Sequence, residues 1–173
     1  GTTTVSGDAA GLGTVTLQSD VAGATGTVGF EGGFTATSIT TYGRGYDISF
    51  TGNSTQVTNA VTFINTGALI LGDAYTDEFI FNGGVTHTAG DTTLSGTLQT
   101  SDDAITLDNL TLGTNSVIRS LNAAAGAAIA INGNITGAGN NLTLVSGSGT
   151  TTVSGDAAGL GTVTLQSDVA GAT

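Results

Sequence analysis

The first 25 residues of the chain return unchanged as its last 25. Gly1–Thr25 and Gly149–Thr173 are identical, which sets a period of 149 − 1 = 148 residues. A fixed period indicates an array in which each unit buries its apolar face against its neighbours. We therefore expect residues 1–148 to form one complete tandem-repeat unit and residues 149–173 to begin the next. The two copies should superpose after a shift along one axis. An engineered duplication is the alternative, although no tag or linker is visible.

A shorter motif recurs inside the unit, in which an apolar residue is followed by any residue and then by glycine. Between these motifs, Thr or Ser alternates with Val, Ile, Leu or Phe, as in Leu142–Val145. Alternation with a period of two is typical of half-buried strands, and glycine is suited to the corners between them. The alanine-rich segment Asn122–Ala128 is the exception. We expect it to be a tight loop that enters a strand rather than a helix, because Gly126 interrupts it.

The spacing of these motifs favours an all-β chain folded as a β-solenoid, a parallel β-helix-like stack of short strands. The motifs are about 25 residues apart on average, although unevenly spaced, so six or seven coils of ~4.8 Å each would make a unit ~30 Å long. The alternative is a repeat of β-sandwich domains. Sandwiches usually bury several large aromatic side chains, whereas only 5% of this chain is aromatic and Trp is absent.

The charge balance excludes several partners. The formal net charge is −11, and Arg44 and Arg119 are the only Lys or Arg residues, so we expect neither nucleic acid nor anionic lipid to bind. No apolar run approaches the ~20 residues of a membrane helix, and we expect no membrane insertion. The chain has no cysteine, which suits export of an unfolded chain. We therefore expect an extracellular or cell-surface location.

Two segments carry a resemblance to known proteins. Ile129–Ser148 and Leu142–Gly155 combine short alternating strands with glycine and asparagine corners. In this respect the chain resembles the β-solenoid repeats of filamentous-haemagglutinin-like and autotransporter-like bacterial surface proteins, and the giant β-strand-repeat adhesins. The resemblance implies a solenoid fold and a secreted, surface-attached setting. It implies no ligand and no residue-specific role.

Two acidic groups are candidates for a cation site. The first is Asp73 with Asp77 and Glu78, and the second is Asp102 with Asp103 and Asp108. Carboxylate oxygens are the ligands that calcium prefers, so calcium is a possible cofactor at either group. Both known calcium loop patterns are absent, and solvated carboxylates in turns explain the two groups equally well. No other cofactor is expected.

One loop is a candidate for binding or assembly. Tyr42, Arg44 and Tyr46 alternate with glycines, and no other part of the sequence combines aromatic rings with a cation in this way. Such a loop could stack on a sugar or dock a neighbouring chain. The alternative is that both rings simply pack over the edge of a coil.

Two further patterns carry weaker hypotheses. His87 lies in the alternating run Val85-Thr86-His87-Thr88, and we interpret a lone strand histidine as a surface residue. Threonine-rich runs such as Thr14-Val15-Thr16 invite comparison with ice-binding solenoids, but their uneven spacing predicts no regular ladder.

The sequence favours a structural function. We expect a tandem-repeat segment of an extracellular adhesin, filament or sheath, in which stacked coils make a stiff rod and the main partner is another copy of the repeat. A module that binds carbohydrate or a host receptor is the alternative. A polysaccharide-degrading enzyme built on Asp102 or Asp103 is the third hypothesis. Adjacent strand residues point to opposite faces, so we expect no enzyme and name no catalytic residue.

Overall fold

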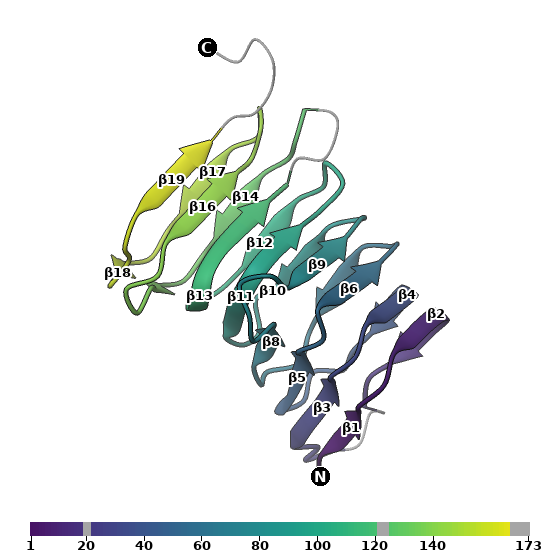
Figure 1. The fold of residues 1–173 in the computed structure, drawn as a ribbon. Helices are drawn as coiled ribbons and strands as arrows, with labels where there is room; N and C mark the ends of the chain where they lie inside the picture. Colours follow the sequence, from purple (N-terminus) through teal and green to yellow (C-terminus); the bar gives the residue numbers. More distant parts are fainter. Residues whose placement is uncertain (19–21, 121–124, 167–173) are drawn as a thin grey trace.

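The chain forms a parallel β-solenoid of about seven turns. The structure is a computed structural model and describes residues 1–18, 22–120 and 125–166. Within these residues there is no helix, and strands of successive coils stack side by side from the N-terminal end to the C-terminal end (Figure 1). Strand pairs such as β10 (Val85–His87) with β12 (Ile105–Leu107) are parallel, as the ladder of a solenoid requires. The predicted fold is confirmed, and the sandwich alternative is wrong.

Each full coil has three faces, which we number in chain order. The first face stacks β1 (Thr3–Val5), β3 (Gly26–Phe30), β5 (Tyr46–Phe50), β8 (Leu69–Leu71), the first halves of β11 (Thr92–Gln99) and β13 (Leu110–Arg119), β15 (Ile135–Thr136) and β18 (Ala157–Ala158). The second face stacks β2 (Ala9–Thr16), β4 (Phe34–Thr40), β6 (Ser54–Val57), β9 (Glu78–Phe81), the second halves of β11 and β13, β16 (Leu142–Val145) and β19 (Val163–Gln166).

The third face is a separate sheet. It stacks β7 (Val61–Phe63), β10 (Val85–His87), β12 (Ile105–Leu107), β14 (Ile129–Ile131) and β17 (Thr151–Val153). In the first two coils, the ends of β2 and β4 turn onto this face. Thr41 Oγ1 accepts a hydrogen bond from Ile64 N (2.9 Å) and donates one to Thr62 O (3.3 Å), which sets the end of β4 beside β7.

The coils differ in length, although their strands align. Successive register partners are as few as 110 − 92 = 18 residues apart and as many as 142 − 116 = 26. Most of the variation is taken up by loops at the corners, because a shift of one residue within a strand turns the side chains that follow to the other side. The exception is a register shift of one residue within β2, between Ala9 and Leu12. Uneven motif spacing is therefore compatible with an even ladder.

The core lies inside the stacked coils and changes character along the axis. All six phenylalanines lie between residues 30 and 81, and Phe50 packs against Phe30 and Phe34 with ring centroids 5.2 and 5.1 Å away. From Leu94 onward the buried hydrophobic side chains are all aliphatic. The low aromatic content is thus concentrated in the N-terminal half of the rod.

The corners bring backbones of adjacent coils close together. A Cβ on Gly52 would lie 2.0 Å from Gly32 O, so this corner has no room for a side chain. Asparagine and aspartate also connect corners of successive coils. Asn109 Oδ1 accepts from Asn134 N (2.8 Å), and Asn134 Oδ1 accepts from Asp156 N (2.9 Å).

The two identical segments lie on different faces of the solenoid. Thr3–Val5 pairs with β3 on the first face, whereas its copy Thr151–Val153 pairs with β14 on the third. The backbone is similar at one position, since Gly11 and its copy Gly159 have φ values of 67° and 64°. Elsewhere it differs, because β2 is one continuous strand and its copy is divided between β18 and β19. The expectation of a pure axial shift is therefore wrong. A rotation by one face accompanies the shift, because the period is not a whole number of coils.

Part of the alanine-rich segment lies outside the described residues, namely residues 122–124. The part that is described contains Gly126, whose φ is 77°, and leads into β14, which begins at Ile129. The expected entry into a strand at the end of this segment is confirmed.

Candidate functional site

The first acidic group forms a corner of the fourth coil rather than a ligand shell. Asp77 is buried, and its Oδ2 accepts hydrogen bonds from the backbone N–H groups of Asp73 (2.9 Å) and Ala74 (3.0 Å). Asp73 and Glu78 are exposed. The carboxylate of Asp77 therefore closes the loop between β8 and β9, which is a structural role that the sequence analysis did not identify.

The second acidic group is divided by a strand. Asp102 and Asp103 precede β12, and Asp108 follows it. Asp102 has a φ of 64°, and its Oδ1 accepts a hydrogen bond from Gly126 N (3.2 Å) in the next coil. Among the described residues, which include both acidic groups, no set of three or more His, Cys, Asp or Glu side chains is placed to hold a metal ion. Neither group is gathered as a calcium site would require.

The loop from Tyr42 to Tyr46 is tied to the coil beneath it. Tyr46 is fully enclosed, and its hydroxyl accepts from Tyr42 N (3.0 Å) and donates to Leu17 O (3.0 Å). Burial raises the pKa of the Tyr46 phenol above its usual 10.0. This corrects the sequence interpretation of Tyr46, because an enclosed ring cannot stack on a sugar. Tyr42 and Arg44 are half-buried, and the Arg44 Nη1 donates to Gly43 O (2.9 Å).

His87 lies in the core, so its interpretation as a surface residue is wrong. The alternation itself is as expected, since the inward-facing His87 stands between the outward-facing Thr86 and Thr88. The ring packs edge-on against Phe63, and its Nδ1 is 2.9 Å from Thr92 Oγ1. Burial lowers the pKa of His87 below its ordinary 6.5. This ring takes the core position that Phe63 and Leu107 take in the coils on either side.

Outward-facing threonines form a row on the third face. Successive register partners in this row are Thr62, Thr86, Thr106, Ala130 and Thr152. The pair Thr16 and Thr40 extends the row into the first two coils. None of these threonine side chains donates a hydrogen bond within the described residues, and all are exposed or half-exposed. The prediction that uneven spacing prevents a ladder is therefore wrong, because the corner loops absorb the unevenness.

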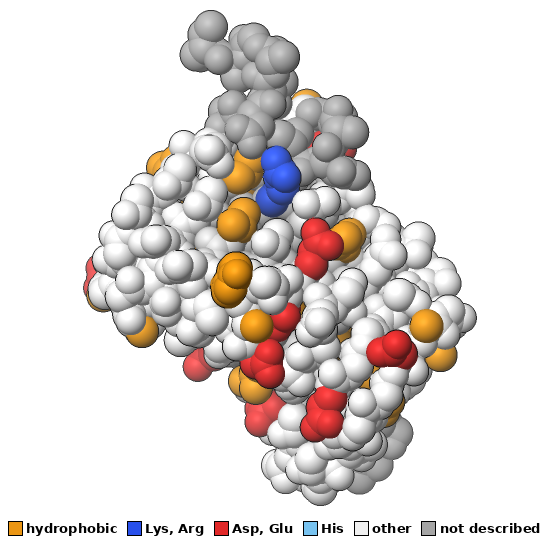
Figure 2. All heavy atoms as spheres, viewed as in Figure 1, with side chains coloured by type: hydrophobic (Ala, Val, Ile, Leu, Met, Phe, Trp, Pro, Cys, Tyr) orange, Lys and Arg blue, Asp and Glu red, His pale blue; other side chains and the backbone are white. Residues whose placement is uncertain are grey.

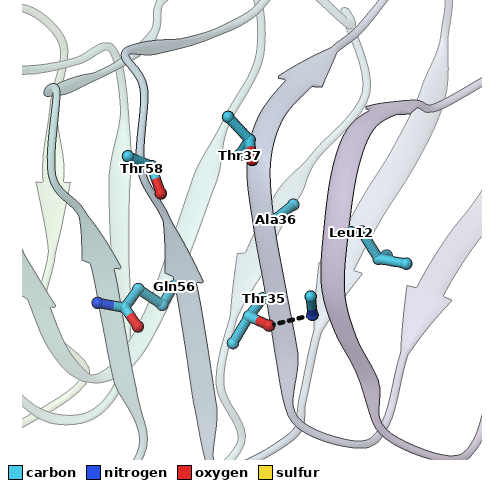
Figure 3. A pocket seen from close by; sticks show the side chains of 7 residues that line it. Leu12, Thr35, Ala36, Thr37, Gln56 and Thr58 are labelled. Carbon is cyan, nitrogen blue, oxygen red and sulfur yellow. Dashed lines mark hydrogen bonds between the residues drawn. The ribbon is translucent and has the colours of Figure 1, made fainter.

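A shallow hollow lies on the second face of the first three coils (Figure 3). It is lined by Gly11, Leu12, Thr35, Ala36, Thr37, Gln56 and Thr58. Gly11 N donates to Thr35 Oγ1 (2.7 Å) across its floor. The lining offers hydroxyl groups and one amide but no ionisable group. It has the chemistry of a weak polar contact rather than of acid–base catalysis.

The charged groups do not gather on the face shown in Figure 2. Carboxylates are scattered among uncharged side chains and backbone, and apolar groups appear singly. Large apolar side chains are exposed chiefly at the two ends of the rod. At the C-terminal end, Val153, Val163 and Leu165 are 38%, 48% and 67% exposed, and at the N-terminal end, Val5 and Leu12 are 37% and 36% exposed.

The described part of the chain contains no helix of the length and apolarity that crossing a membrane requires. Comparison with known proteins gives no relative to which the chain can be assigned. No family model, no curated protein and no solved structure matches it.

Proposed function

We propose that the chain is a structural segment of an extracellular tandem-repeat protein, in which stacked β coils form a stiff rod. The observation that carries the proposal is the identity of residues 1–25 with residues 149–173, joined to a ladder whose two end coils are open. Another copy of the same repeat is its main partner. The rod would extend a surface adhesin or form the body of a filament or sheath.

The stiffness follows from the direction of the hydrogen bonds. Ladder bonds run between coils, along the axis of the rod, and the core is continuous from Val28 to Leu144. Bending the rod would open hydrogen bonds and buried contacts on one side together. Stability therefore accumulates as units are added.

Composition supports an extracellular location. The chain has 13 carboxylates against two arginines, and repulsion between rods of one charge sign keeps long assemblies dispersed. The absence of cysteine removes unwanted cross-links during export. The resemblance to β-solenoid surface proteins points to the same setting.

The proposal is tested by building proteins of one, two and four complete units. Each added unit should lengthen the particle by ~32 Å at constant width, because a unit contains just under seven coils of ~4.8 Å. Small-angle scattering and electron microscopy measure both dimensions. Separate globules joined like beads, without a continuous rod, would reject the proposal.

The threonine row favours a second candidate, a module that binds extended carbohydrate. Along this parallel sheet, hydroxyl and methyl groups repeat at the ~4.8 Å spacing of the coils, except at Ala130. Such a row can make the same contact many times along one polymer chain. It is polar without charge, as a neutral polysaccharide requires.

Paired substitutions separate this candidate from the scaffold. Replacing Thr86 and Thr106 by lysine interrupts the row on the third face. The matched control replaces Thr93 and Thr111, which are outward-facing register partners on the first face of neighbouring coils. Binding to insoluble polysaccharide should fall at least tenfold in the first variant only. Equal binding by both variants, or none by the parent chain, would leave the scaffold role alone.

A further inference from the structure

We propose that the open C-terminal coil, residues 149–166, is the docking surface for the next coil of an array. That coil would be formed by residues 26–41 of the unit that begins at Gly149, which we call the following unit. In such an array, each unit is turned by one of the three faces relative to the unit before it. This inference rests on the proposed role of the chain as a repeat in an array. It specifies the geometry of the contact between two units.

The rotation follows from the register of the first face. Its partners run from Thr3 through Val28, Ile48, Leu69, Thr92, Leu110 and Ile135 to Ala157. These seven turns take 157 − 3 = 154 residues, whereas the repeat has 148. The difference of six residues equals the step from Thr3 to Ala9, which carries the chain from the first face to the second. One repeat unit therefore contains seven turns of the solenoid minus one of the three faces of a turn.

The two copies of the repeated segment, at the N-terminal and the C-terminal end, show the two contacts that this segment would make in an array. The C-terminal copy shows how the segment lies on the coil that precedes it, with Thr151 beside Ile129 and Val163 beside Leu142. The N-terminal copy shows how the same residues receive the coil that follows, with Val5 beside Phe30 and Val15 beside Ile39. A strand has two edges, and the two copies use opposite ones. Both contacts can therefore be made at once.

The exposed apolar residues at the C-terminal end are copies of residues that lie beside the second coil at the N-terminal end. Val163 and Leu165 are 48% and 67% exposed, whereas Leu17, the copy of Leu165, is only 3% exposed under the following coil. In an array, Phe30 and Ile39 of the following unit would cover Val153 and Val163 as they cover Val5 and Val15 here.

Polar groups at the same end fix the register. Asp8 Oδ1 accepts a hydrogen bond from Gly33 N (2.8 Å), and Asp156 is the copy of Asp8. A Cβ on Gly32 would lie 2.5 Å from Gly7 C, so the approach needs glycine at position 32, and Gly155 is the copy of Gly7. Asp156 thus presents the carboxylate acceptor that residue 33 of the following unit requires, and Gly155 lies where residue 32 of that unit would approach.

The rotation determines how an array presents any group that occurs once per unit. Tyr75 is 72% exposed, and in successive units it would face three directions in turn. Three units make twenty turns, so the same face would present Tyr75 again every ~96 Å. A group repeated in this way contacts partners on all sides of the rod rather than along one side.

Engineered cysteines test the rotation within this 173-residue chain, because the chain has no cysteine of its own that could compete in cross-linking. Ala130 and Thr152 are register partners, and adjacent strands are ~4.8 Å apart, within reach of a disulfide. The pair Ala130→Cys and Thr152→Cys should therefore cross-link on mild oxidation. The control pair Thr136→Cys and Thr152→Cys would be adjacent only if the copies were related by a pure axial shift. Cross-linking of the control pair instead of the first would overturn the rotation.

A two-unit protein tests the junction. Spin labels at Tyr75→Cys in both units should be further apart than the axial rise of ~32 Å, because they lie on different faces. The matched control repeats residues 3–8 once more at the junction, which restores seven whole turns and brings the labels into line. Equal distances in both proteins would overturn the inference even if both are rods. Failure to form a continuous rod would instead reject the proposed function.

Discussion

His87 Nδ1 lies 2.9 Å from Thr92 Oγ1 inside the core, across the corner between the third face of one coil and the first face of the next. One of these atoms donates the proton and the other accepts it, according to the tautomer of the ring. Asp91 and Asp108 raise the pKa of His87, but burial lowers it by more. The histidine is therefore held neutral.

We predict that the free energy of unfolding falls as the pH is lowered below about 6.5, the ordinary pKa of histidine. The pKa of His87 is lower in the folded chain than its unfolded value of about 6.5, so the unfolded state binds the proton more readily. The contribution of neutral His87 to the free energy of unfolding should be fully present above about pH 6.5. It should decrease below that pH until the pKa of His87 in the folded chain is reached. Denaturant titrations at a series of pH values measure the effect.

The control for this prediction is His87→Leu, because leucine occupies the adjacent core position at Leu107. This variant should lose the part of the pH dependence that lies just below pH 6.5. If the free energy of unfolding of this variant still falls below pH 6.5 as steeply as that of the parent, the pH dependence comes from the carboxylates and not from His87.

The same substitution in the two copies should have different effects. A Cβ on Gly155 would lie 2.4 Å from Gly133 O, whereas a Cβ on Gly7 has nothing within 4 Å. We expect Gly155→Ala to cost about 1–3 kcal/mol through overpacking, and Gly7→Ala to stay within about 0.5 kcal/mol. Since the surrounding sequences are identical, equal losses would show that the coil beneath is not the cause.

Truncation of Phe50 should be among the most damaging core changes. Its ring is fully enclosed, stacks on Phe30 and meets Phe34 edge-on. We expect Phe50→Ala to lower the free energy of unfolding by about 3–5 kcal/mol, measured by chemical denaturation. The exposed Tyr75 provides the control, and Tyr75→Ala should change stability by less than about 0.5 kcal/mol. A loss below 1 kcal/mol at Phe50 would contradict this packing.

Removal of the Asp77 carboxylate should open the loop between β8 and β9. Asp77→Ala leaves the N–H groups of Asp73 and Ala74 without their acceptor, at a cost of about 1–3 kcal/mol. Asp77→Asn keeps one acceptor oxygen and should retain part of this stability. Glu78→Ala, which alters an exposed neighbour, is the control. Hydrogen exchange at residues 73 and 74 should accelerate in Asp77→Ala, and unchanged exchange there would contradict the role.

The alternation of side chains along a strand could be predicted more reliably than the roles of individual residues. Alternation correctly separated His87 from Thr86 and Thr88, but it could not tell which of the two sides faced the core. Aspartate and tyrosine are common in exposed loops, so nothing local distinguished the buried Asp77 and Tyr46 from their exposed neighbours. The hydroxyl of Tyr46 bonds to Leu17 of an earlier coil, and the carboxylate of Asp77 bonds to the backbone of its own loop, so neither role follows from the residue type.

The strand-and-glycine pattern, the repeat and the stacking of short parallel strands could be inferred from the order of residues alone, because they depend on local alternation and on an identity that can be read directly. The number of residues in each turn, and with it the face on which each strand lies, could be seen only in the three-dimensional structure. Val5 and Val153 have identical neighbours along the chain, yet one lies on the first face and the other on the third. The physical reason is that the face of a strand depends on the summed lengths of all the coils before it, including corner loops whose lengths no local pattern fixes.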